Sequence, residues 1–291
     1  MKIVKIVGGL GNQMFQYAFL LTLRESSGDE VLMDTSVFDT YKLHNGFELE
    51  RVFNISARKA TKEELKRLTR YTTSYTLYRI YKKLFPALRT ECREKNFCDY
   101  DLTIFEDYKK LYYDGYWQNY QYFDKYEKQI REEFTFKMPL DKKSEHLLLD
   151  IQNEKKCVSL HIRRGDYLKH KLYKGLCDLT YYQTAIDYVI KKHGEDVRFI
   201  LFSNDITWCN QYIRPLLGDL ELVVVDWNGG RDSYRDMQLM CSCSINVIAN
   251  SSFSWWAAYL NEQKDKEVIA PKKWINSSVN FQIQMPDWTL F

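Results

Sequence analysis

Residues 3–18 read IVKIVGGLGNQMFQYA, an apolar run followed by a glycine-rich turn and a segment with helical periodicity. The apolar run at residues 3–7 predicts a buried strand, and the glycines within residues 8–11 predict a tight turn. The apolar positions that recur at helical spacing after the turn are Met14, Phe15, Ala18 and Leu21. A strand, a glycine turn and a helix in this order predict the first unit of an α/β fold.

The second half of the chain repeats this alternation of apolar runs and helical stretches. β-rich runs lie at residues 157–162, 197–202, 220–225, 244–249 and 267–270. The alternation predicts a parallel sheet with crossover helices, and runs this continuously apolar are typical of strands buried on both faces. A polar stretch at residues 140–156 separates the halves, so we expect an N-terminal domain of residues 1–155 and a C-terminal domain of residues 156–291.

The composition excludes several classes of protein. The chain has 291 residues, 45% of them hydrophobic, which suffices for one large domain or two medium ones. Its 42 basic and 39 acidic residues are too balanced for a protein that binds nucleic acid mainly through phosphate contacts. The first apolar run is short and contains Lys5, so we expect neither a signal peptide nor a membrane anchor. We therefore expect a cytoplasmic protein, either free or peripheral to the inner membrane face.

Polar clusters follow four of the expected strands at their carboxyl ends. The clusters are HIRRGDY at residues 161–167, SND at 203–205, DWN at 226–228 and NSSFS at 250–254. Parallel strands present their carboxyl ends at one edge of the sheet, and open α/β sheets bind ligands at that edge. We therefore expect the ligand-binding residues of the C-terminal domain within these clusters.

The first cluster places two adjacent arginines, Arg163 and Arg164, beside Asp166 and His161. A guanidinium group matches phosphate oxygens bidentately, so two of them at a strand end suit a diphosphate. The alternative is a surface ion pair between an arginine and Asp166, worth about 0–1 kcal/mol. Adjacent arginines point in different directions, and an ion pair with one leaves the other without this partner, which favours anion binding.

The last cluster, residues 250–254, lies between an expected strand and an expected helix. Serine hydroxyls and backbone amides at the start of a helix form an uncharged anion-binding site. Ordinary helix capping needs a single serine, whereas this segment has Ser251, Ser252 and Ser254. From this segment alone, an anion site and a simple N-cap are both open.

The glycine turn also admits a dinucleotide-binding interpretation, strengthened by Asp34 at about the spacing of a ribose contact. Met14 stands where that motif requires its third glycine and is too large for close packing of helix on strand. The turn equally suits a segment that presents the backbone amides of Asn12 and Gln13 to a binding cleft.

Two other segments have both a functional and a structural interpretation. Asp99 and Asp101 resemble the carboxylate pair that holds a divalent cation in many nucleotide-sugar enzymes. They lie outside any buried strand end, so we expect a solvated turn. The five histidines are not spaced in the sequence like a pair of zinc ligands, which argues against zinc. We therefore expect no metal site. The aromatic stretch at residues 108–126 suits either a sugar-stacking cleft or core and rim packing.

Four segments together resemble the α-1,2-fucosyltransferase family, a family 11 type of glycosyltransferase. They are GGLGNQMFQYA at residues 8–18, HIRRGDY at 161–167, FSND at 202–205 and NSSFSWWAA at 250–258. The likeness keeps the order of the motifs and spans most of the chain. Asn204 departs from the family pattern, because many relatives have aspartate at this position. Asparagine carries no charge, so the departure matters for any role that requires a charged side chain here.

The resemblance implies a GT-B architecture, in which two Rossmann-like domains face a central cleft. It implies transfer of L-fucose from GDP-fucose to the 2-hydroxyl of a terminal β-galactoside on an oligosaccharide, with inversion and without a metal or other cofactor. The absence of targeting signals suggests a bacterial enzyme that builds lipopolysaccharide, capsule or a related glycan.

The resemblance also implies roles for individual residues. Arg163 would hold the donor pyrophosphate, His161 would lie near the nucleoside, and Asp226 would accept hydrogen bonds from the guanine edge. The remaining donor-side residues are Arg164, Ser203, Asn204, Ser251, Ser252, Phe253 and Ser254. The residues that the N-terminal domain contributes to the cleft are Gly9, Gly11, Asn12 and Gln13.

Arg163 and Asp166 are the candidate catalytic residues. Departure of GDP develops negative charge, which preorganised arginine and serine donors can stabilise in place of a metal. Inversion needs an acceptor hydroxyl, ideally one that loses its proton to a carboxylate. Asp166 is the nearest candidate in sequence, and the alternative is that it only orients Arg163 or Arg164.

Two functions from other classes stand as alternatives. An NAD-dependent oxidoreductase would use the glycine turn together with Asp34. A non-catalytic glycan-binding protein would use the aromatic stretch, although two arginines at a strand end count against it.

Overall fold

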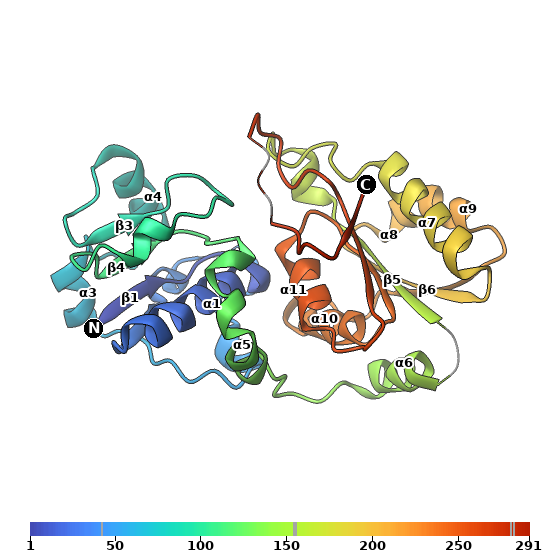
Figure 1. Ribbon diagram of the computed structural model, residues 1–291, viewed down its shortest axis with the longest axis horizontal. Helices are drawn as coiled ribbons and strands as arrows, with labels where there is room; N and C mark the ends of the chain where they lie inside the picture. Colours follow the sequence, from blue (N-terminus) through green and yellow to red (C-terminus); the bar gives the residue numbers. More distant parts are fainter. Residues whose placement is uncertain (42, 154–155, 280, 282) are drawn as a thin grey trace. The chain divides into compact units, whose positions relative to one another are not determined.

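The computed structural model describes residues 1–41, 43–153, 156–279, 281 and 283–291 (Figure 1). The chain forms two compact units, Met1–Met138 and Pro139–Phe291. Each unit has its own β-sheet, and the strands within each sheet pair in parallel. This arrangement confirms the expected α/β class.

The first unit is built on a four-stranded sheet in the order β2-β1-β4-β3. The strands are β1 (Lys2–Lys5), β2 (Val31–Asp34), β3 (Glu91–Arg93) and β4 (Tyr112–Asp114). The helices are α1 (Leu10–Ser27), α2 (Leu49–Val52), α3 (Lys62–Leu68), α4 (Tyr75–Leu84) and α5 (Glu127–Glu133). Helix α1 is buried over most of its length and ends at Gly28, whose φ of 66° is the left-handed conformation that glycine adopts without strain.

The second unit is built on a six-stranded sheet in the order β10-β9-β8-β5-β6-β7. The strands are β5 (Lys156–Ile162), β6 (Val197–Ser203), β7 (Glu221–Val225), β8 (Ile245–Val247), β9 (Glu267–Ala270) and β10 (Thr289–Leu290). The helices are α6 (Lys142–Asn153), α7 (Leu179–His193), α8 (Ile206–Trp208), α9 (Arg214–Leu217), α10 (Tyr234–Cys241) and α11 (Ser252–Leu260). Helices α7 and α9 cover one side of the β5–β6 region, and α10 and α11 lie on the other (Figure 1). The five β-rich runs of the sequence are thus strands β5 to β9.

The division between the units differs from the boundary expected at residue 155. Helix α6 is rich in charged residues, yet its Ser144, Leu147 and Ile151 are buried. The hydroxyl of Ser144 accepts a hydrogen bond from the indole N–H of Trp227 at 3.0 Å. Arg235 of α10 forms an ion pair with Asp141 at 2.7 Å. Residues 139–153 therefore belong to the second unit, because they pack on it rather than link the units.

Both sheets contain a point where the chain switches from one side of the first strand to the other. In the second unit the chain runs outward from β5 to β6 and β7, and then adds β8 on the opposite side of β5. In the first unit β2 and β4 flank β1 in the same way. The crevice at the carboxyl ends of the two diverging strands is the usual ligand site of an open α/β sheet.

Candidate functional site

The switch point of the second unit brings together two of the polar clusters expected from the sequence. Strands β5 and β8 are direct neighbours, with Leu160 paired to Val247. The residues that follow them therefore meet at one edge of the sheet. The imidazole ring of His161 lies 6.0 Å from the ring of Phe253, centroid to centroid. Burial raises the pKa of Tyr167, and an interaction with Ser251 is among the effects that lower it, which places the two residues near each other.

Arg163 and Asp166 form an ion pair at this edge. Nη2 of Arg163 donates to Oδ1 of Asp166 at 2.7 Å, and the guanidinium lies 5.3 Å from the centre of the Tyr167 ring. The sequence left open an ion pair between an arginine and Asp166 as the alternative to anion binding, and this ion pair is present. The side chain of Arg163 is still 27% exposed, so the pair leaves this cation accessible to a ligand.

Arg164 points elsewhere and has different partners. Its Nε donates to Asp205 at 3.0 Å, and its guanidinium stacks over the Trp208 ring at 3.9 Å from the ring centre. The sequence suggested that adjacent arginines diverge, and they do. The expected donor contact of Arg164 stays a prediction, but the observed partners give this arginine a structural role beside α8.

Asn204 fixes the backbone of the first cluster. Its Oδ1 accepts the N–H of Arg164 at 2.9 Å. Gly165 has a φ of 64°, and a side chain there would place a Cβ only 2.8 Å from Nδ2 of Asn204. A neutral amide thus satisfies this position, which offers a reason why aspartate is not required. Ser203 accepts the N–H of Asp205 at 3.0 Å and so shapes the same turn.

The serines after β8 have different environments. Ser251 is the N-cap residue of α11 and makes no side-chain cap bond. Ser252 and Phe253 are partly exposed in the first turn of α11. Ser254 is fully buried, and its hydroxyl donates to the carbonyl of Ser251 at 3.3 Å. The first turn of α11 can therefore meet an anion through Ser252 and Phe253, while Ser254 faces the interior.

His161 is buried and neutral. Burial, and secondarily the charge of Arg163, lower the pKa of His161 to about 3. Within the described part of the chain its Nδ1 has no hydrogen-bond partner. Since buried polar atoms are normally satisfied, this nitrogen is suited to a ligand group.

Asp226 is separated from this group. It is exposed at the carboxyl end of β7, and β6 lies between β7 and β5 in the sheet. The next residues, Trp227 and Asn228, bind Ser144 of α6. The guanine contact expected for Asp226 stays a prediction.

The glycine turn of the first unit lies at the switch point of its sheet. Oδ1 of Asn12 accepts a hydrogen bond from Gln118, which follows β4, at 2.6 Å. Gly9 is close to His44, since a Cβ there would lie 3.3 Å from the imidazole ring. Gly11 is buried in the first turn of α1.

Gln13 differs from the expectation that it reaches a cleft. It is fully buried, and its Nε2 donates to the carbonyls of Gly8 and Gly46, each at 2.8 Å. Its Oε1 accepts the N–H of Glu48 at 2.9 Å. All of these bonds tie neighbouring loops together, so Gln13 acts as a structural residue.

Asp34 does not fit the ribose-binding role of a dinucleotide site. It is buried 2.8 Å from Nζ of Lys5, and it accepts hydrogen bonds from the hydroxyl of Tyr112 and the N–H of Ser36. Burial by itself would raise the pKa of Asp34, but Lys5 and these donors hold it below its usual value. The carboxylate is therefore already satisfied within the protein.

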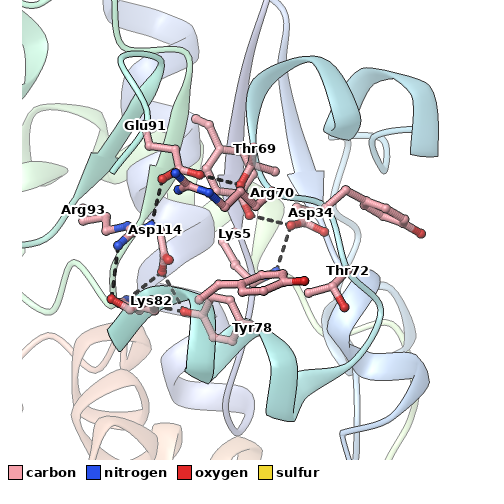
Figure 2. Close-up of a pocket in the computed structure, with 13 residues that line it drawn as sticks. Lys5, Asp34, Thr69, Arg70, Thr72, Tyr78, Lys82, Glu91, Arg93 and Asp114 are labelled. Carbon is pink, nitrogen blue, oxygen red and sulfur yellow. Dashed lines mark hydrogen bonds and ion pairs between the residues drawn. The ribbon is translucent and has the colours of Figure 1, made fainter. Parts of the chain in front are cut away.

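Figure 2 shows the small cavity beside this ion pair. It is lined by the last residues of all four strands of the first sheet, Lys5, Asp34, Arg93 and Asp114. Its volume of about 20 Å³ holds roughly one water molecule. The Lys82 ammonium and the Tyr78 hydroxyl each bind Asp114 at 2.8 Å. The cavity is thus part of a satisfied polar network and is too small for a sugar.

The two remaining segments are mainly structural. In the aromatic stretch, Trp117 is fully buried and stacks on Phe19 at 4.3 Å between ring centres, as core packing requires. Asp101 caps a turn by accepting the N–H of Thr103 at 3.0 Å. Among the described residues, no group of three His, Cys, Asp or Glu side chains could hold a metal ion. In the same residues, no helix has the length and apolar character needed to cross a membrane.

Comparison with known proteins gives a consistent set of relatives. Residues 1–291 match the family described as Glycosyl transferase family 11. An α-1,2-colitosyltransferase of Escherichia coli is 32% identical over 94% of this chain and 91% of its own. The O-antigen biosynthesis glycosyltransferase WbnK of E. coli is 32% identical over 97% of each chain. Galactoside α-(1,2)-fucosyltransferase 1 of Oryctolagus cuniculus is 28% identical over 87% of this chain and 62% of its own.

A solved structure supports the fold. The crystal structure of NodZ α-1,6-fucosyltransferase soaked with GDP-fucose matches with a TM-score of 0.53 at 14% identity, and the match covers 89% of this chain and 92% of that one. At this identity the likeness concerns the fold alone. It confirms the GT-B type of α/β architecture that the sequence motifs implied.

Proposed function

The chain belongs to glycosyl transferase family 11 and is a glycosyltransferase, and we propose that it transfers L-fucose from GDP-β-L-fucose to the 2-hydroxyl of a terminal β-galactoside. The family uses a nucleotide-sugar donor, and a GDP-fucose-soaked enzyme shares the fold. The observation that carries the proposal is the meeting of Arg163 and His161 with the first turn of α11 at one switch point.

This group of residues suits a nucleoside diphosphate. Arg163 supplies a fixed cation for the pyrophosphate, and the first-turn amides of α11 supply uncharged donors. His161 stays neutral and offers a ring nitrogen to the ligand. Negative charge that develops on departing GDP then meets preorganised donors, which is the largest single contribution in many enzymes. We propose that no metal is needed for this step.

The stereochemistry follows from the proposed acceptor. Attack by the galactose hydroxyl on the face opposite to GDP inverts the anomeric carbon and converts a β-linked donor into an α-linked product. Asp166 forms an ion pair with Arg163, which supports a role in orienting the arginine over a role as the base that accepts the proton of the acceptor hydroxyl. We propose that the first unit binds the acceptor at the switch point beside Asn12, in keeping with its sheet-edge position.

The donor sugar is the point on which the relatives differ, because one of them is a colitosyltransferase. Colitose is fucose without the 3-hydroxyl, so the two donors differ by a single group. Initial rates with GDP-fucose and GDP-colitose, each with lactose as acceptor, test the assignment. We expect the higher kcat/KM with GDP-fucose, and a higher value with GDP-colitose would contradict the proposed donor. The O-antigen role of a relative supports a surface glycan as the product, and we propose that this glycan is made in the cytoplasm.

A further inference from the structure

Two segments meet at the switch point of the first sheet, residues 7–16 and residues 115–118, and two hydrogen bonds join them. Gln16 of α1 accepts the N–H of Val7 at 2.8 Å and donates to the carbonyl of Gly115 at 3.1 Å. Gln118 donates to Oδ1 of Asn12 at 2.6 Å. The segment after β1 and the segment after β4 therefore fix each other's position. The position of Asn12 thus depends on the turn at residues 115–118.

The turn at residues 115–118 has an unusual backbone. Trp117 has a φ of 55°, a left-handed conformation that a bulky residue rarely adopts. Gly115 is required for space, since a Cβ there would lie 2.5 Å from Cβ of Glu94 and 2.7 Å from the Trp117 ring. A backbone of this kind persists only where surrounding contacts impose it.

Glu94 supplies those contacts. Oε2 of Glu94 accepts the N–H of Tyr116 at 2.8 Å, and Oε1 accepts the N–H of Trp117 at 3.0 Å. Glu94 follows β3 directly, and β3 pairs with β4 so that Arg93 lies opposite Asp114. The carboxylate is thus placed by the sheet itself beside the turn. Because each of its oxygens already holds a backbone N–H, Glu94 is poorly placed to accept a proton from a substrate.

We infer that Glu94 is a positioning residue for the acceptor sugar, which acts by fixing the 115–118 turn and, through Gln118, the carboxamide of Asn12. The inference rests on the proposed function, in which the acceptor binds beside Asn12. A carboxamide in a fixed orientation recognises sugar hydroxyls well, because it presents a donor and an acceptor at defined positions. Glu94 reaches the acceptor only through Gln118 and Asn12.

The test compares the acceptor and donor constants of the Glu94→Gln variant, with lactose and GDP-fucose as substrates. Glutamine keeps the size of the side chain but replaces one accepting oxygen with an NH2 group that cannot accept an N–H. We expect the KM for lactose to rise about tenfold, the effect of losing one hydrogen bond to a charged group. The KM for GDP-fucose and the Kd for GDP stay unchanged, because the proposed donor residues belong to the second unit.

A second variant, Gln118→Leu, removes the hydrogen bond between Gln118 and Asn12 and leaves the two hydrogen bonds of Glu94 unchanged. If the two residues act along one path, the double variant loses no more acceptor affinity than the worse single variant. Glu133→Gln is the matched control. Glu133 also accepts a backbone N–H, from Ser56 at 2.7 Å. Its other partners are the hydroxyls of Tyr17 and Ser56 and the guanidinium of Arg24, none of which lies in the first turn of α1. Its KM for lactose should equal that of the wild type.

The outcomes separate this inference from the proposed function. Wild-type protein that transfers no fucose contradicts the proposed function itself. Wild-type transfer together with an unchanged lactose KM in Glu94→Gln and Gln118→Leu overturns the positioning role alone. The positioning role is also overturned if the losses of acceptor affinity add up in the double variant, or if the KM for lactose and the KM for GDP-fucose rise equally.

Discussion

Nη2 of Arg163 lies 2.7 Å from Oδ1 of Asp166 at the carboxyl end of β5. Both side chains are partly exposed, at 27% and 58%, so this ion pair adds little to the stability of the fold. Its effect is geometric, because a carboxylate bound to one nitrogen restricts the orientation of the planar guanidinium group. The two residues are therefore expected to act as one unit toward a bound diphosphate.

Replacing Arg163 with alanine should lower kcat by about 100- to 1,000-fold, the usual effect of removing one preorganised donor to a developing negative charge. Steady-state rates with GDP-fucose measure this. Arg164→Ala is the matched control, because this neighbouring arginine is held by Asp205 and Trp208. We expect it to change kcat by less than about tenfold, because its guanidinium is already held by partners within the protein. Equal losses in both variants would contradict the role assigned to Arg163.

The Asp166→Asn variant distinguishes an orienting residue from a base. If Asp166 orients Arg163, the variant should bind GDP more weakly and also turn over more slowly, since both depend on the arginine. Calorimetry of GDP binding alongside kcat measures the two effects. Lost turnover with unchanged GDP affinity would instead identify Asp166 as the base.

His161 should make the protein sensitive to acid. Its pKa is lowered to about 3 in the folded state from a usual value near 6.5, chiefly by burial. The unfolded chain therefore binds a proton that the folded chain excludes, and the free energy of unfolding falls as the pH drops from about 6.5 toward 3, by roughly 1.4 kcal/mol per pH unit. Urea unfolding of the wild type and of His161→Gln across this range measures the difference. Parallel pH curves for the two proteins would contradict a buried neutral histidine.

Glu94 should have the opposite pH dependence. Burial raises the pKa of Glu94 to about 7, against the lowering effect of the N–H groups of Tyr116 and Trp117 and of the Lys82 charge. Between pH 4.5 and 7 the folded state holds a proton that the unfolded chain loses, so stability falls as the pH rises through this range and is level above it. Since Glu94 is partly exposed, we expect a total change of roughly 1–3 kcal/mol.

The charged and titratable groups that interact with Glu94 include Lys82, Asp114, Cys98, Tyr116 and Tyr122. The Glu94→Gln variant keeps all of them, so it isolates the contribution of the carboxyl group. Between pH 4.5 and 7, the free energy of unfolding of this variant should change less than that of the wild type, by roughly 1–3 kcal/mol. An identical slope would show that Glu94 has an ordinary pKa.

The sequence predicts most of the second unit because its strands are continuous apolar runs. Strands β5 to β9 match the expected runs closely, and their polar carboxyl ends lie at one sheet edge. The sequence does not predict the short strands β3 and β4, since ECR and YYD are polar or aromatic triplets without an apolar run. Strand β10 carries no sequence signal either, because two residues have no periodicity.

The site can be predicted only in part from the sequence, because a motif does not show which of its residues are buried and which can contact a ligand. Gln13 and Asn12 are adjacent in the glycine motif, yet Gln13 is buried in a structural network and Asn12 binds Gln118. Arg163 and Arg164 diverge in the same way. Glu94 carries no sequence signal, since its importance arises from the backbone of a turn more than 20 residues later in the chain.

The most direct test of the account is fucose transfer from GDP-fucose to lactose in the presence of excess EDTA, with the linkage of the product determined by NMR. We predict an α-1,2-linked fucosyl product, formed at a rate that added magnesium does not raise. A product with another linkage, or activity that EDTA abolishes and magnesium restores, would contradict the proposed reaction.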